Sequence, residues 1–598
     1  MEDDNKGWNQ FKRIKLDRKQ LTKRVKKAEG ATQRHAHRFL VRRIDNVRLV
    51  SREITTWLVI VGVMIASLGL QLVWGERDYT TSAPVAGGVY AEGVVGELET
   101  LNPLFATTAT EASVAKLVFS SLYSYDETGT LRQDIAKSMT ANAEGTEYTI
   151  MLRDDVSWHD ETPLNAKDIV YTINLIKNPA ARSPLRVNWT DVSVSAVGDY
   201  GVKFTLPAAY AAFPHALTFP VLPEHLLESV AAGAIRESTF SRSPVGTGPF
   251  EFRLLQSADP VTNHKVVHLV ANENYYAGSP KLDRFEVHAY EDEASILKAL
   301  KSSEISGAAG VSVTSAKDVD TKRFNLTPQS IDSGVYLILN TTNPILKDDK
   351  VRKALQVGTD TKQLRENIGG GVQPLDGPIL EIAGVAENLP KLPPANINEA
   401  KKMLDEAGWK VSGSYRVKDG KKLELTISTT KNAEYEKAVA NVESQWQKLG
   451  VVVKKRVIDT SNVTSNFIQD TLQARNFDVL LYELLIGADP DVYAYWHSSQ
   501  IGQSGYNFAS YSNQAVDASL ASARERSEPA LRSAKYGVFV RQWQKDAPGI
   551  ALYQPVLEYV SSKNVDSVDK DARLVTEADR FANVQYWTVA TDSVYKTP

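Results

Sequence analysis

The stretch YTIMLRDDVSWHDETPLNAKDIVYTI, residues 148–173, contains the clearest local pattern in this chain of 598 residues. Apolar and polar side chains alternate over residues 148–152, which predicts a half-buried strand. A charged turn follows, and a second turn ends at Pro163. Asn165 can then cap a helix whose third position is Asp168, a favourable place for a negative charge. The stretch therefore predicts a strand, a turn and a helix, as is typical of α/β proteins.

A second region further along the chain has a regular α/β rhythm. Asn398 can cap a helix there. A strand at Leu423–Thr429, a helix at Glu434–Leu449 and a strand at Val451–Ile458 then follow. Two strands joined by one helix at this spacing predict a right-handed crossover on a parallel sheet.

The composition limits the class of protein. A chain of this length exceeds one hydrophobic core and predicts several lobes or domains. It has no cysteine, which excludes disulfides, cysteine-ligated metals and a lipid anchor on cysteine. The net charge of −3 is uneven, because residues 1–53 contain 16 Lys/Arg and 7 Asp/Glu and the remainder carries −12. An acidic remainder does not favour binding to nucleic acid.

Residues 54–74 form an uncharged run of 21 residues. As a helix this run is about 31 Å long, enough for the hydrocarbon core of a bilayer. Trp57 and Trp74 lie near its ends, where interfacial aromatics are expected, and the positive-inside rule places the basic residues 1–53 in the cytoplasm. A retained transmembrane helix is favoured over a cleaved signal peptide or a core helix by the long preceding region. Residues 1–53 are expected to be a solvated topology signal, with attachment to anionic headgroups as the alternative.

Several short motifs resemble, in their order and spacing, the family 5 extracellular solute-binding proteins, which deliver peptides and other solutes to ABC importers. The stretch at 148–173 is similar to the signature region of that family. The other matching pieces are Leu101–Leu104, PVGTGPF at 244–250, NYYAGSPKLD at 274–283, VRKAL at 351–355, EAKKMLDEAGW at 399–409, ADPD at 488–491 and YNFASY at 506–511. The resemblance extends through most of residues 89–598, and no single piece would suffice for it.

The resemblance implies an α/β fold like that of the periplasmic binding proteins, with mixed sheets, an extra subdomain and two lobes that close on the ligand like a Venus flytrap. One transmembrane helix precedes this ectodomain. The expected organisation is a basic cytoplasmic segment (1–53), a transmembrane helix (54–74), a linker (75–88), the first part of lobe I (89–130), its extra subdomain (131–245), its second part (246–335), lobe II (336–553) and a return to lobe I (554–598).

The resemblance also implies a ligand site, and this chain departs from the family at its most diagnostic position. In peptide-binding members a carboxylate shortly before an aspartate-proline pair, here Asp489-Pro490, commonly pairs with the amino terminus of the peptide. An ungapped alignment places Ile486 at that position and Glu483 at the position of a family aromatic. Either Glu483 replaces the missing acid in a reshaped loop, or the ligand has no free amino terminus. Ordinary packing is the alternative for each of the other residues implied to contact ligand, which are Asn102, Thr247, Tyr336, Tyr482, Trp496 and Asn507.

The motifs do not predict an enzyme. An H-E-x-x-H motif, a P-loop and a nucleophile elbow are absent from the sequence, and His159 beside Asp160 is interpreted as part of a structural turn. We expect a monomeric receptor, held on the membrane, that binds a peptide or another small solute without a cofactor or metal and delivers it to ABC permease subunits. The alternatives are a surface sensor or adhesion module on the same fold, and an extracellular hydrolase.

Overall fold

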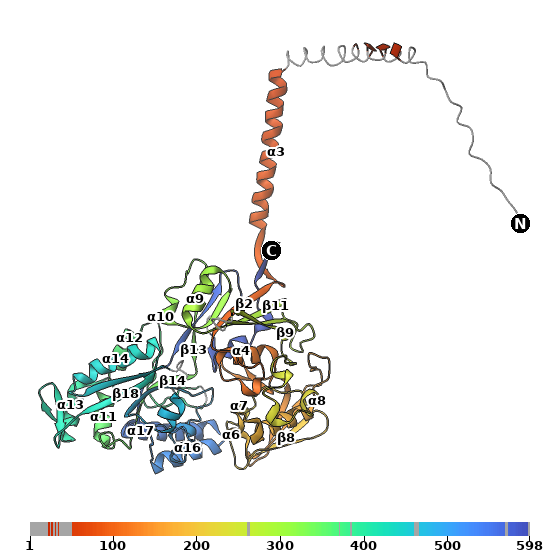
Figure 1. The fold of residues 1–598 in the computed structure, drawn as a ribbon. Helices are drawn as coiled ribbons and strands as arrows, with labels where there is room; N and C mark the ends of the chain where they lie inside the picture. Colours follow the sequence, from red (N-terminus) through yellow and green to blue (C-terminus); the bar gives the residue numbers. More distant parts are fainter. Residues whose placement is uncertain are drawn as a thin grey trace. The chain divides into compact units, whose positions relative to one another are not determined.

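The computed structural model describes residues 51–259, 264–369, 371–382, 385–459, 466–568 and 572–595, together with residues 22–23, 26–27, 30–31 and 34. The chain divides into two compact units. The larger unit is Pro84–Thr591, and the smaller one joins Met1–Ala83 with Asp592–Pro598. The three large sheets of the protein all lie in the larger unit (Figure 1).

The strand and helix predicted for residues 148–173 are both present. β6 (Glu147–Leu152) alternates buried and more exposed side chains, and α5 (Ala166–Lys177) follows it. Asn165 caps α5, and the carboxylate of Asp168 accepts a hydrogen bond from the backbone of Asn165, which completes a capping box. β6 belongs to a four-stranded antiparallel sheet with the order β5-β6-β8-β7. This sheet and its helices form the subdomain, which contains β5 (Ala136–Ala141), β7 (Ser193–Ala196), β8 (Gly201–Thr205), α6 (Arg186–Trp189), α7 (Phe213–Ala216) and α8 (Glu224–Leu227).

An eight-stranded mixed sheet forms the framework of lobe I. Its order is β23-β13-β22-β12-β2-β11-β10-β9, and β2 runs parallel to both β11 and β12. Helix α4 (Ala109–Val118) packs on one face, and α9 (Glu293–Ser302) and α10 (Val313–Ala316) pack on the other. The strands are β2 (Val89–Val95), β9 (Phe250–Asp259), β10 (His264–Ala271), β11 (Arg284–Tyr290), β12 (Gly307–Ser312), β13 (Phe324–Ile331), β22 (Val556–Ser562) and β23 (Arg573–Leu574).

The turn at residues 244–250 fits tightly against the end of α4. A Cβ added at Gly246 would lie 1.8 Å from the carbonyl oxygen of Val118, so only glycine fits there. The amide of Gly246 donates to Nδ1 of His159 at 3.2 Å, and Nε2 of the same ring lies 3.1 Å from the carbonyl oxygen of Gly248. Burial lowers the pKa of His159 to about 4, which keeps the ring neutral. His159 therefore belongs to a structural turn, as predicted.

A five-stranded sheet with the order β19-β18-β20-β14-β21 forms the framework of lobe II. Helices cover both of its faces (Figure 1), so alternate residues of β14 and β20 enter two different cores. The strands are β14 (Ser333–Leu339), β18 (Glu424–Thr430), β19 (Val452–Ile458), β20 (Val479–Leu485) and β21 (Gly549–Tyr553). The helices are α11 (Asp349–Val357), α12 (Thr361–Ile368), α13 (Ile397–Glu406) and α14 (Ala433–Gln447) on one face, with α16 (Gln514–Glu525) and α17 (Pro529–Asp546) on the other.

Lobe II confirms the predicted crossover and corrects one helix start. β18 and β19 run parallel, and α14 connects them. Helix α13 is capped by Asn396 and not by Asn398, because Asn396 has extended backbone and its side chain accepts hydrogen bonds from the amides of Asn398 and Glu399. The sequence offers two asparagines two residues apart, and only backbone geometry distinguishes them.

The chain passes between the lobes twice, through neighbouring segments. Asp332 separates β13 from β14, and Gln554-Pro555 separates β21 from β22. The side-chain amide of Gln554 donates to the carbonyl oxygen of Ile331 at 2.8 Å, which holds the two crossings together. The buried carboxylate of Asp332 accepts from Nε of Arg573 at 2.7 Å. These two crossings form the hinge between the lobes.

The first crossing lies earlier than the predicted boundary between residues 335 and 336. Ser333 and Gly334 already pair with Leu485 and Leu484 of β20. Ser333 and Gly334 have a low intrinsic preference for strands, so the strand start predicted from the sequence is too late.

The C-terminal segment returns to lobe I and is joined to its first strand by a buried ion pair. β22 lies between β12 and β13. Further on, Nε of Arg580, in η8 (Glu577–Phe581), donates to Glu92 of β2 at 3.0 Å, and the hydroxyl of Tyr559 donates to the same carboxylate at 2.7 Å. Arg580 also donates to the hydroxyl of Ser113 at 2.7 Å. Both charged side chains are fully buried.

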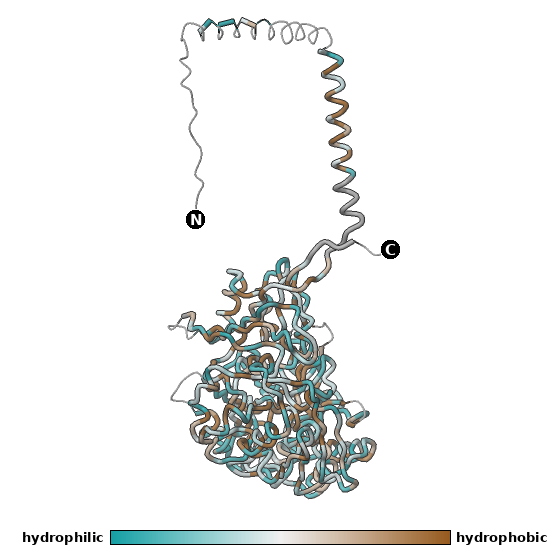
Figure 2. The backbone as a smooth tube through the Cα atoms, turned by 90° about the vertical axis from the view of Figure 1, so that its right-hand side faces the viewer, coloured by the Kyte–Doolittle hydropathy of each residue, from teal (hydrophilic) through white to brown (hydrophobic). Residues whose placement is uncertain are grey.

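The smaller unit contains one long helix, α3 (Ser51–Tyr79). Its segment Ser51–Gln71 is long and apolar enough to cross a membrane, and its side chains are exposed (Figure 2). The predicted linker at 75–88 has partly regular structure. Helix α3 continues into it as far as Tyr79, and β1 (Thr80–Val85) pairs with β24 (Ala590–Tyr595). Polar residues after an apolar run do not end a helix when no proline follows them directly. Most of the basic segment 1–53 lies outside the described residues.

Candidate ligand-binding site

Glu483 lies near the end of β20 and faces helix α14. Its Oε1 accepts a hydrogen bond from the hydroxyl of Ser333 at 2.6 Å, and its Oε2 accepts from the hydroxyl of Tyr435 at 2.9 Å. Among the described residues, no lysine, arginine or histidine forms an ion pair with this carboxylate. Two neutral donors orient the group, and its negative charge is left without a positive partner.

The charge of Glu483 affects the pKa of glutamates in both lobes. Burial raises the pKa of Glu434, in the first turn of α14, and the charge of Glu483 raises it further. Burial likewise raises the pKa of Glu577 in lobe I, with Glu483 again contributing. Glu293 of α9 also raises the pKa of Glu434. Acids of both lobes therefore raise these two pKa values, while the cations Lys437 and Arg580 lower the pKa of Glu434 and of Glu577 respectively. We call Glu293, Glu434, Glu483 and Glu577 the acidic group.

The lobes touch beside the acidic group. Nζ of Lys437, on α14 of lobe II, donates to the hydroxyl of Thr314, on α10 of lobe I, at 3.0 Å. A second contact joins the subdomain to α16, where the amide of Ala211 donates to the carbonyl oxygen of Arg524 at 2.8 Å. The guanidinium of Arg524 lies 4.6 Å from the ring centroid of Tyr210. These contacts define the lobe junction.

The segment after β20 is held by the hinge and by a buried ion pair. The amide of Ile486 donates to the carbonyl oxygen of Asp332 at 2.9 Å, and the Ile486 side chain is buried. Asp489 binds Arg532 through two hydrogen bonds of 2.7 Å, and both side chains are almost fully buried. This segment is a rigid support. Glu483 itself lies in regular strand, paired with Val335, so β20 is not reshaped at that position.

The predicted contact residues of lobe II occupy different environments. Tyr482 and Glu483 point to opposite faces of the sheet, and the Tyr482 ring packs edge-on against Phe508 with centroids 5.9 Å apart. Tyr336 and Trp496 are fully buried neighbours, and neither Tyr336 OH nor Trp496 Nε1 has a hydrogen-bond partner among the described residues.

The side chain of Asn507 forms hydrogen bonds within a turn. Its Nδ2 donates to the carbonyl oxygens of His497 and Tyr511, at 3.1 and 2.8 Å, and its Oδ1 accepts from the amide of Tyr511 at 3.1 Å. The side chain is fully buried. Its ligand contact stays a prediction, and these bonds give it a structural role in any case.

The two predicted residues of lobe I are also buried. Oδ1 of Asn102 accepts from the amide of Leu104 and caps η2 (Pro103–Phe105), while Nδ2 donates to the hydroxyl of Ser241 at 3.1 Å. Thr247 lies in the glycine turn, and its hydroxyl has no partner among the described residues. No hydrogen bond of the described residues brings Asn102 or Thr247 to the lobe II set.

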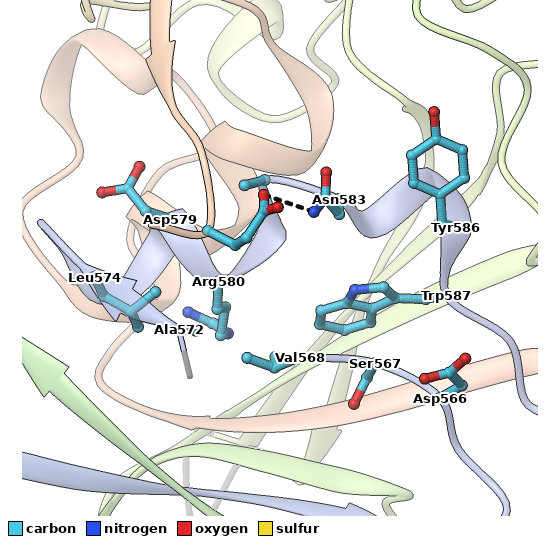
Figure 3. A pocket seen from close by; sticks show the side chains of 12 residues that line it. Asp566, Ser567, Val568, Ala572, Leu574, Asp579, Arg580, Asn583, Tyr586 and Trp587 are labelled. Carbon is cyan, nitrogen blue, oxygen red and sulfur yellow. Dashed lines mark hydrogen bonds between the residues drawn. The ribbon is translucent and has the colours of Figure 1, made fainter. Parts of the chain in front are cut away.

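A cavity of about 470 Å³ lies within lobe I and not at the lobe junction. Figure 3 shows Arg580 and Trp587 among the side chains around it. Nδ2 of Asn583 donates to Oε2 of Glu127 at 2.7 Å. Arg580, the cation among the described lining residues, is already paired with Glu92. It is lined by Glu127, Asp566, Ser567, Val568, Ala572, Leu574, Asp579, Arg580, Ala582, Asn583, Tyr586 and Trp587.

The sequence did not point to several residues of the junction. Glu434 and Tyr435 lie in the first turn of α14, shortly after the N-cap Asn432, so they look like ordinary first-turn residues. Glu577 opens a short helix in the same way. The start of a helix can be predicted from its capping residue. Which part of the protein its first turn contacts depends on the tertiary structure and cannot be predicted in this way.

The model of the bacterial extracellular solute-binding proteins, family 5 (Middle), matches residues 130–505, which is more than half of the chain. The chain belongs to this family. This family 5 protein is 28% identical over 540 residues to the oligopeptide-binding protein AppA of Bacillus subtilis, with 86% of this chain and 96% of AppA covered.

Solved structures show the same architecture for this family 5 protein. AppA of Bacillus subtilis in complex with a nonapeptide matches with a TM-score of 0.69 and 25% identity, covering 85% of this chain and all of AppA. NikZ of Campylobacter jejuni in complex with Ni(L-His) matches with a TM-score of 0.71 and 27% identity, covering 84% and 99%. The two-lobed α/β fold with mixed sheets is therefore confirmed, and the ectodomain is an extracellular solute-binding domain.

Proposed function

We propose that this chain is a receptor on the cell surface that captures a peptide or peptide-like solute between its lobes and presents it, unaltered, to an ABC import permease. Family membership supports the receptor role, and the likeness to AppA, whose structure holds a nonapeptide, supports a peptide. The receptor works as a single copy. Solute binds the closed form better than the open form and so shifts the lobes towards closure about the hinge.

The observation that carries the proposal is the uncompensated carboxylate of Glu483 at the lobe junction. A protonated amino terminus supplies the missing positive charge and donates charge-assisted hydrogen bonds. We propose that Glu483 and the half-buried Tyr482 contact the solute. Asn102, Thr247, Tyr336, Trp496 and Asn507 are buried, and their contact with the solute stays a prediction.

The first test is thermal unfolding of the full chain in detergent with three ligand types. A peptide with a free amino terminus is expected to raise the melting temperature, because a ligand at 100 times its Kd stabilises the folded state by about 2.7 kcal/mol. The same peptide with an acetylated amino terminus is expected to act only at much higher concentration. A response to Ni(L-His) alone would contradict a peptide ligand.

Import is tested separately in cells. Cells that lack this chain are expected to lose uptake of a labelled peptide that raises its melting temperature, and restored expression returns uptake. Unchanged uptake in such cells would instead assign the chain to sensing or adhesion.

We propose in addition that α3 crosses the membrane once, with residues 1–53 in the cytoplasm and the larger unit outside. The apolar segment Ser51–Gln71 and the basic residues before it support this orientation. With the basic residues in the cytoplasm, the acidic ectodomain lies outside the cell, as expected of an extracellular solute-binding domain.

Topology can be measured cleanly because the chain has no cysteine of its own. A single cysteine at the exposed Val187 is expected to react with a membrane-impermeant maleimide on intact cells. A cysteine at Asn5 is expected to react only after the cells are opened, and the parent chain serves as the unlabelled control. Labelling of the Asn5 variant on intact cells would contradict the proposed orientation.

A further inference from the structure

Three histidines and a glutamate gather on one face of the β10–β11 pair in lobe I, outside the candidate ligand site. The antiparallel register pairs Val266 with His288 and His268 with Glu286. Because side chains alternate along a strand, His264, His268, Glu286 and His288 share one face. This face is the one covered by α9. Glu304, in the turn that follows α9, reaches the same place.

Three of these side chains converge on one point. One ligand atom from each of His264, His288 and Glu304 lies within 4.8 Å of the others. Nε2 of His264 is 3.3 Å from Nδ1 of His288. Two nitrogens bound to one tetrahedral Zn²⁺ at about 2.0 Å are themselves about 3.3 Å apart. The two imidazoles are thus already at the separation that a shared zinc ion requires. Oε1 of the half-exposed Glu304 lies 3.8 Å from the other nitrogen of His264, Nδ1, so this carboxylate has to turn towards Nε2 to complete the site.

The surroundings hold both rings in place. Oε2 of Glu286 is 3.4 Å from Nε2 of His288, which leaves Nδ1 facing His264. A carboxylate behind a histidine in this way fixes its ring and raises its basicity in metal sites. The ring of Tyr290 stacks on His264 with centroids 4.4 Å apart.

A buried hydroxyl beside the cluster also favours an ion. The hydroxyl of Tyr290 has no hydrogen-bond partner among the described residues. A water molecule on a bound ion would give this hydroxyl a partner.

We propose that His264, His288 and Glu304 form a zinc site in lobe I, with a water molecule as the fourth ligand. The ion ties the β10–β11 pair to the turn after α9, two parts of lobe I that are otherwise joined there by packing. Its role is to stabilise lobe I, and it is independent of the solute carried between the lobes.

The test is equilibrium dialysis of the full chain in detergent against ZnCl₂ after treatment with EDTA, with bound zinc measured by mass spectrometry. One zinc per chain is expected, together with a higher melting temperature. Glu304→Gln and His264→Asn are each expected to weaken zinc binding at least tenfold and to abolish the rise in melting temperature. Glu304 is half exposed, so its replacement leaves the metal-free fold intact.

Two matched controls separate this site from other histidines. His225→Asn, at a histidine paired with Asp160 elsewhere in lobe I, is expected to bind zinc like the parent chain. A variant with His35→Gln and His37→Gln is expected to do the same, which excludes the N-terminal histidines. Zinc binding that survives Glu304→Gln and His264→Asn, or the absence of stoichiometric zinc in the parent chain, overturns the proposal.

Discussion

Replacing Arg580 with alanine is expected to destabilise lobe I by about 3–5 kcal/mol, because it leaves the fully buried carboxylate of Glu92 without its counter-ion. Among the residues that the structure describes, the Tyr559 hydroxyl would be the one remaining donor to that carboxylate. The loss should appear as faster hydrogen exchange in β2 and β22 of the full chain, measured by mass spectrometry. Exchange in the lobe II strands is expected to change less, since those strands form a separate sheet.

The matched control is Arg236→Ala. Arg236 also pairs with a glutamate, Glu99, but both side chains are about half exposed or more and the contact is 3.4 Å. An exposed pair contributes about 0–1 kcal/mol, so little change is expected. The double variant Glu92→Met/Arg580→Met should recover part of the loss, because it leaves no buried charge unpaired. Equal effects of Arg580→Ala and Arg236→Ala would show that the buried pair is not a main support of lobe I.

Replacing Glu483 with glutamine is expected to weaken binding of a peptide with a free amino terminus by about 10- to 100-fold. The change removes one charge and keeps the shape of the side chain. A hydrogen bond between charged groups contributes about 1.5–3 kcal/mol, which corresponds to that range of affinity. The glutamine can still bond Ser333 and Tyr435, because a hydroxyl both donates and accepts. Isothermal titration calorimetry on the full chain in detergent measures the change.

Two comparisons make the result specific. Glu436→Gln removes a charge from an exposed residue in the first turn of α14 and should leave affinity unchanged. Affinity for the acetylated peptide should be the same in Glu483→Gln and the parent chain. If both peptides lose affinity equally, or neither does, Glu483 does not bind the amino terminus and the ligand is held in another way.

Local features of the fold could be predicted because they depend on neighbours in sequence. The capping box of Asn165 and Asp168 closes within four residues, and the β18–α14–β19 crossover needs only its own three elements. The overall two-lobed architecture was implied by the family resemblance, and the solved relatives confirm it.

The site itself could be predicted only in part, because it depends on contacts between distant segments. Asn507 and Asn102 form hydrogen bonds inside the protein that the sequence did not reveal, and their contact with ligand stays a prediction. Glu483 is oriented by residues 150 and 48 positions away. No periodicity in the sequence encodes such pairs. The histidine cluster of β10 and β11 was missed for the same reason, since its members belong to two strands and a turn.

The strand order of lobe I has a consequence for biosynthesis. β22 is made after the whole of lobe II, yet it inserts between β12 and β13, which are made before it. As the ribosome works from the N-terminus, lobe II can assemble while β12 and β13 still lack their shared neighbour. The early-made lobe is therefore the last to close, and its open strand edges need protection from aggregation until translation is nearly complete.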